Sequence, residues 1–147
     1  MTMKTILVSL VAALAALSLH AAELEWHTDL VKAQAKAKAE KKQVLVNFTG
    51  SDWCGFCIKL QKEVFTTDEF KEFAGKNLVL VELDFPRKKE LPADLKAANK
   101  KLQDQYQVKG FPTLLLLDGD GKKVGQMVGY GGGGTKAVLE KVGATKG

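Results

Sequence analysis

The chain carries both of its cysteines within one stretch, Phe48-Thr49-Gly50-Ser51-Asp52-Trp53-Cys54-Gly55-Phe56-Cys57. The apolar run 44–48 is typical of a buried strand, and Gly50 to Asp52 interrupt it, so the sequence predicts a helix that opens near Cys54. Unpaired backbone N–H groups at a helix N-terminus would stabilise a thiolate on Cys54. Cys57, one helical turn later, is expected to lie close enough to react with Cys54 and to be more deeply buried.

Two cysteines at this spacing also have simpler interpretations, an inert disulfide or half of a metal site. A disulfide that closes so small a loop would stabilise the fold little, and zinc needs about four ligands. Outside the N-terminal segment the chain adds only His27 to the two cysteines. Because a thiolate is the species that attacks a disulfide, the pair indicates thiol–disulfide exchange, with Gly55 letting the turn form tightly. We expect no metal and no organic cofactor beyond a redox-active Cys54–Cys57 disulfide.

The rest of the sequence alternates between helical and strand patterns. Four helices are predicted: from a Thr28 cap to about Lys42, from a Thr66–Glu69 capping box to about Gly75, over Pro92–Tyr106 and over 136–142. Three further strands are predicted over Leu78–Asp84, Leu114–Leu117 and Lys122–Tyr130. Strand–helix–strand units imply parallel strands, and the hairpin turn at 118–121 adds an antiparallel edge. We expect an α/β fold with a central mixed sheet of four to five strands and helices on both faces.

The N-terminus differs in kind from the rest of the chain. Lys4 precedes the apolar run 6–19, and small residues follow at Ala21 and Ala22, which is the pattern of a secretory signal peptide. The run is shorter than the roughly 20 residues that a transmembrane helix needs. We therefore expect a cleaved signal peptide over 1–22, a folded domain over 23–147, no stable membrane anchor, and a periplasmic or secreted location where disulfides persist.

Length and charge limit the function further. A chain of 147 residues gives one domain, and its formal net charge is +5. The lysines alternate with acidic residues along the predicted helices, which is the pattern of a solvated surface. We expect a monomer that binds no nucleic acid.

Two motifs in the right order carry a resemblance to a known family. Residues 48–57, followed by Lys59-Leu60, resemble the active-site stretch of the thioredoxin superfamily, particularly its exported bacterial thioredoxin-like branch. Gly110-Phe111-Pro112-Thr113 resembles the family's second hallmark, a cis-proline loop that faces the cysteines. The likeness covers roughly Trp26 to Val142, and it implies a thioredoxin-like fold.

The resemblance also implies an activity and roles for single residues. The chain would be a thiol-disulfide oxidoreductase for protein disulfides and dithiols, with Cys54 as the exposed nucleophile and Cys57 as the resolving thiol. Pro112 would be cis, the backbone of Phe111 would pair with a substrate strand, and Trp53 would shield one side of the site. Electrons would pass to or from a redox partner protein that the sequence does not identify.

The chain departs from the family pattern at two positions. Phe56 stands where the family often has proline or histidine, which leaves the direction open between reductase, oxidase and isomerase. Asn47 replaces the buried aspartate of reducing thioredoxins, and an asparagine cannot shuttle a proton for Cys57. Glu82, or else Asp84, on the neighbouring predicted strand is the candidate proton shuttle. These departures also motivate an alternative, a non-catalytic, chaperone-like binding module.

Overall fold

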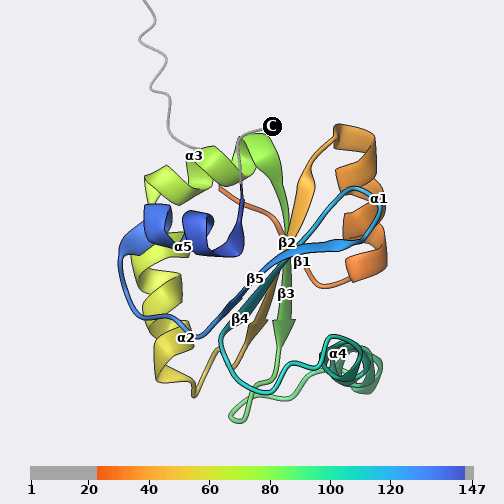
Figure 1. Ribbon diagram of the computed structural model, residues 1–147. Helices are drawn as coiled ribbons and strands as arrows, with labels where there is room; N and C mark the ends of the chain where they lie inside the picture. The colour runs from red at the N-terminus through yellow and green to blue at the C-terminus, as the bar shows by residue number, and fades with distance from the viewer. Residues whose placement is uncertain (1–22, 145–147) are drawn as a thin grey trace, which may run out of the picture.

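Five strands form one mixed sheet in the order β1-β3-β2-β4-β5 in the computed structural model, which describes residues 23–144 (Figure 1). The strands are β1 (Trp26–His27), β2 (Gln43–Thr49), β3 (Leu78–Asp84), β4 (Thr113–Leu117) and β5 (Lys123–Val128). Strands β1, β3 and β2 run parallel, and β4 and β5 are antiparallel to their neighbours. The predicted mixed sheet is therefore confirmed: β1, β3 and β2 form its parallel part, and the β4–β5 hairpin forms one side of it.

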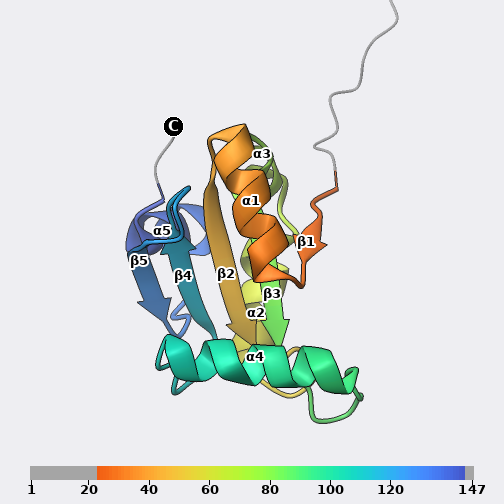
Figure 2. The same cartoon turned by 90° about the vertical axis from the view of Figure 1, so that its right-hand side faces the viewer.

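Helices cover both faces of the sheet, as predicted. One face carries α1 (Leu30–Glu40) and α4 (Ala93–Gln105), and the other carries α2 (Gly55–Leu60), the π-helical turn η1 (Gln61–Phe65), α3 (Asp68–Asn77) and α5 (Gly134–Val142) (Figures 1 and 2). None of these helices within residues 23–144 is long and apolar enough to cross a membrane. The predicted signal peptide, 1–22, lies outside the described residues.

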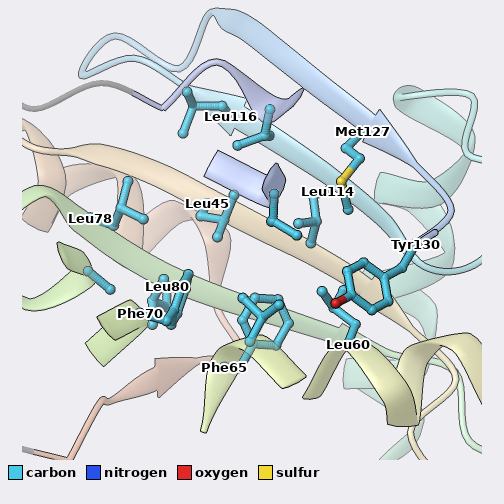
Figure 3. Packing of buried hydrophobic residues seen from close by; sticks show 14 residues of the cluster. Leu45, Leu60, Phe65, Phe70, Leu78, Leu80, Leu114, Leu116, Met127 and Tyr130 are labelled. Carbon is cyan, nitrogen blue, oxygen red and sulfur yellow. The ribbon is translucent and has the colours of Figure 1, made fainter. Parts of the chain in front are cut away.

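The central strand β2 divides its side chains between two apolar clusters. Leu45 packs with residues of α2, η1, α3 and α5, among them Leu60 and Phe70 (Figure 3). Val46 and Phe48 pack on the other face, against side chains from α1 and α4. Because side chains on both faces of the strand are buried, its sequence is continuously apolar and does not alternate between apolar and polar residues.

Two helix caps differ from the prediction by one residue each. Asp29 caps α1, not Thr28, because its carboxylate accepts the Lys32 N–H at 3.1 Å. Thr67 caps α3, not Thr66, and its hydroxyl accepts the Phe70 N–H at 3.3 Å. In both places two adjacent residues are of types that cap helices well. The backbone conformation at the start of the helix determines which of the two accepts the free N–H. Helix α1 also ends at Glu40, before the predicted Lys42.

The π-helical turn η1 between α2 and α3 was not predicted. It buries the consecutive residues Val64 and Phe65 together. A π turn holds one residue more than an α turn, and no regular helical period in the sequence indicates it.

Candidate active site

The two cysteines lie where the central strand β2 passes through a short turn into α2. Cys54 is the N-cap residue of α2, and its Sγ accepts the Cys57 N–H at 3.3 Å. The two residues form a disulfide, with their Cα atoms 5.2 Å apart. The predicted helix start at Cys54 and the predicted disulfide are both confirmed, and the structure is that of the oxidised form.

The exposure of the cysteines differs from the expectation. Cys54 was expected to be exposed, yet its exposed fraction is 6%, against 4% for Cys57. In the disulfide form the Cys54 sulfur turns back over the first turn of α2, so it does not project outward. Phe56 is the side chain that projects between them, and it is 62% exposed. At Gly55 no atom lies within 4 Å of the place for a Cβ, so packing does not require the glycine that the sequence reading associated with a tight turn.

The predicted proline loop lies beside this turn. The Phe111–Pro112 peptide bond is cis, as predicted. The loop leads into β4, which is antiparallel to β2 with Thr113 opposite Phe48. Strand pairing therefore brings the end of β2 and the start of β4, and with them the two predicted motifs, to the same edge of the sheet.

Trp53 is held on four sides. Its indole N–H donates to the Phe85 carbonyl at 2.7 Å, and its ring meets that of Phe111 edge to face at 5.9 Å between centroids. A Cβ on the buried Gly50 would overlap the indole, so the glycine makes room for it. The Arg87 guanidinium lies over the ring, with Cζ 3.6 Å from the centroid. Trp53 is thus fixed between the cysteine turn, the proline loop and the segment after β3.

Two acidic residues join the cysteine turn to the end of β3 and to the segment that follows it. Asp52 accepts the backbone N–H groups of Arg87 at 3.0 Å and Lys88 at 2.8 Å. The Arg87 hydrogen bond is the main cause that lowers the pKa of Asp52, against a smaller opposing effect of desolvation. Asp84 accepts both the N–H and the hydroxyl of Ser51, at 3.0 and 2.5 Å. The sequence reading missed the roles of Asp52 and Arg87, because a bond from a side chain to a distant backbone group leaves no pattern in the sequence.

A small group of polar side chains lies on the sheet face that α2 covers. Asn47 and Glu82 are register partners on β2 and β3, two residues beyond Leu45 and Leu80 of the apolar cluster on that face. Burial raises the pKa of Glu82, the nearby charge of Asp84 raises it further, and Lys89 opposes both effects. Asn47 is buried, and its Oδ1 has no hydrogen-bond partner among the described residues.

The predicted shuttle candidates therefore differ in their surroundings. The Asp84 carboxylate is hydrogen-bonded to Ser51 and forms an ion pair with Lys89 at 3.2 Å. Within residues 23–144 the carboxylate of Glu82 has no hydrogen bond or ion pair. Over the same residues, no group of three or more His, Cys, Asp or Glu side chains is placed to hold a metal ion.

Comparisons with known proteins agree with this geometry. Residues 30–142 match the model of the family described as thioredoxin-like domain. The chain is 42% identical over 122 residues to the disulfide bond reductase DsbH of Chlamydia pneumoniae, an alignment that covers 83% of this chain and 72% of that protein.

Solved structures give the same result. A structure titled DsbH oxidoreductase superposes with a TM-score of 0.77 at 41% identity, covering 85% of each chain. A thioredoxin from Thermus thermophilus, 19% identical, superposes with a TM-score of 0.59 over 82% of this chain and 85% of its own, which shows a shared fold. With its disulfide at the start of α2 and its cis-proline loop alongside, the chain belongs to the thioredoxin-like family as a thiol-disulfide oxidoreductase.

Proposed function

We propose that the chain is an exported reductase of protein disulfides, in which Cys54 is the attacking thiolate and Cys57 the resolving thiol. The observation that carries the proposal is the position of the pair on the first turn of α2. There the Cys57 N–H points at the Cys54 sulfur, and such a donor at a helix N-terminus favours a thiolate. The name of a relative, disulfide bond reductase, supports the reducing direction.

The reaction proceeds in two exchanges. The Cys54 thiolate of the reduced enzyme attacks one sulfur of a substrate disulfide, which forms a mixed disulfide and releases the other sulfur as a thiolate. The Cys57 thiolate then attacks the Cys54 sulfur, forming the Cys54–Cys57 bond and releasing the second substrate sulfur. Two electrons pass from enzyme to substrate, and the two thiol protons end on the substrate. A separate redox protein has to return two electrons before the next turnover.

The substrate binds along the proline loop in this proposal. The backbone of Phe111 pairs with an extended substrate segment next to Pro112, and the exposed ring of Phe56 contacts it from the cysteine side. Trp53 forms the opposite wall, with Gly55 giving access between the cysteines. The substrates are protein thiols and disulfides.

Glu82 takes the proton of Cys57. Its pKa is raised by burial, so it accepts a proton more readily than an exposed carboxylate. The unpartnered Asn47 Oδ1, at the neighbouring register position, is an acceptor that a protonated Glu82 would satisfy. A Glu82→Gln variant should change the pH dependence of disulfide exchange, and an unchanged profile would exclude this role.

The proposal includes the location. Residues 1–22 are a signal peptide and 23–147 the mature thioredoxin-like domain, which acts in the periplasm or after secretion. N-terminal sequencing of protein recovered outside the cytoplasm should begin near Ala22 or Glu23.

Insulin reduction by dithiothreitol tests the activity. Wild-type protein should accelerate the precipitation of insulin, and a Cys54→Ser variant should not. If wild type and Cys54→Ser instead suppress the precipitation of insulin equally, the chain is a non-catalytic binding module that uses its exposed Phe56. The equilibrium potential against glutathione tests the direction: about −270 mV indicates a reductase, and about −120 to −180 mV a disulfide donor or isomerase.

A further inference from the structure

Arg87 is an exposed cation that contacts Trp53, the residue next to Cys54 in the chain. Its guanidinium stacks on the ring of Trp53, the residue that precedes Cys54, at 3.6 Å from Cζ to the ring centroid. Within residues 23–144 no carboxylate lies in ion-pair distance of it. A guanidinium stacked on an aromatic face keeps its N–H donors at the edge, where they can bind another group.

The position of Arg87 is fixed from the same turn that carries Cys54. Asp52 binds its backbone N–H, and the Trp53 indole binds the carbonyl of Phe85 two residues before it. A side chain held in this way loses little conformational freedom on binding a partner. The neighbouring cations differ, because Lys89 is paired with Asp84 and no stacking contact holds Lys88.

We propose that Arg87 is a specificity residue that binds a carboxylate of the polypeptide substrate close to the disulfide being exchanged. The inference rests on the proposed function and names a substrate class for that same site. A guanidinium matches a carboxylate with two parallel N–H···O bonds, which a lysine ammonium cannot reproduce. Because Arg87 stacks on the residue that precedes Cys54, we expect the carboxylate to belong to an acidic residue a few positions from the substrate cysteine.

The preference comes from direct contact and not from a general positive field. Cations and acidic residues are equally represented around the turn and the loop after β3, namely Arg87, Lys88 and Lys89 against Asp52, Asp84 and Glu90. A long-range field would depend on all the charges of the protein together and would not single out Arg87. This makes Lys88 a matched control, since removing its charge changes the net charge by the same amount.

Three synthetic peptides that share one intramolecular disulfide and differ only in Asp, Asn or Lys two positions from a cysteine test the proposal. Their kcat/KM values with wild-type protein, recycled by dithiothreitol, should rank Asp above Asn by about threefold to tenfold, the size of a partly exposed charge-assisted contact. The Asp/Asn ratio should fall to about one in Arg87→Gln and keep its wild-type value in Lys88→Gln. Arg87→Glu should favour the Lys peptide, a reversal that a purely structural role of Arg87 would not produce. Added salt should lower the wild-type ratio.

The outcomes separate this inference from the proposed function. Wild-type turnover of all three peptides at equal rates would overturn the role of Arg87 and leave the reductase activity standing. Equal loss of preference in Arg87→Gln and Lys88→Gln would also overturn it, in favour of a general charge effect. Turnover of none of the peptides would overturn both. Both peptides in each ratio meet the same enzyme variant, so a change in the reactivity of Cys54 or Cys57 cancels. The intrinsic effect of Asp on the peptide disulfide is the same for every variant, so it cancels when the ratios of the variants are compared with wild type.

Discussion

Replacing Gly50 by alanine should destabilise the protein through Trp53. The added Cβ would overlap the indole ring, and the contacts of that ring with Arg87, Phe111 and the Phe85 carbonyl restrict how it can move away. Overpacking of this kind costs about 1–3 kcal/mol. A displaced indole would also lose its hydrogen bond to the Phe85 carbonyl, worth about 1 kcal/mol. The free energy of unfolding should therefore fall by about 2–4 kcal/mol.

Urea unfolding of the oxidised protein measures this loss. With a slope of about 2 kcal/mol per M, the midpoint of Gly50→Ala should fall by roughly 1–2 M, and the Trp53 indole N–H resonance should shift. Gly75→Ala is the control, because that glycine lies in α3 with open space around its Cβ position and should gain about 0.5–1 kcal/mol. A Gly50→Ala protein as stable as wild type, with an unmoved indole resonance, would refute the tight packing inferred around Trp53.

Three further changes test other contacts. Tyr130→Phe removes the hydroxyl that donates to Glu63 at 2.7 Å, and should lower the free energy of unfolding by about 1–2 kcal/mol; an unchanged urea midpoint would contradict this. Glu82→Gln should stabilise the protein near neutral pH: the folded-state pKa is raised by burial, so ionisation of Glu82 costs stability as the pH rises through that pKa. The stability gained by Glu82→Gln should be smaller at a pH well below the ordinary pKa of 4.5. An equal gain at neutral and at acidic pH would contradict a pKa of Glu82 raised by burial. Asp29→Ala should cost about 1 kcal/mol, whereas Thr28→Ala should stay within about 0.5 kcal/mol of wild type, so equal thermal shifts would contradict the assignment of the cap.

The parts of the fold that sequence reasoning predicted depend on local chemistry. The buried run 44–48, the break at Gly50 and the helix start at Cys54 each follow from neighbouring residues, and so does the hairpin after β4. A second motif of only four residues, Gly110 to Thr113, was enough to predict the proline loop. So short a motif indicates this loop only when the cysteine motif precedes it in the chain.

The contacts that were missed join residues far apart in sequence. Asp52 binds backbone groups 35 and 36 positions away, and Tyr130 binds Glu63 at a separation of 67. Such pairs depend on the tertiary arrangement of the strands, since the sheet register decides which turns become neighbours. The choice between Thr28 and Asp29 is similar, because two adjacent capping residues are nearly equivalent until the packing of α1 sets the angle of entry.

The position of β2 has a consequence for how the protein fluctuates. This strand is hydrogen-bonded along both edges, to β3 and to β4, while β1 and β5 each leave one edge open. Its amide protons can exchange with water only when a large part of the sheet separates, so they should be the slowest to exchange. Cys54 stands one short turn beyond the end of that strand, and the proline loop precedes its partner β4. The Cys54 sulfur is thus attached to the strand expected to unfold locally least often. Local unfolding at the edges of the sheet should therefore leave the arrangement of the cysteines and the proline loop unchanged.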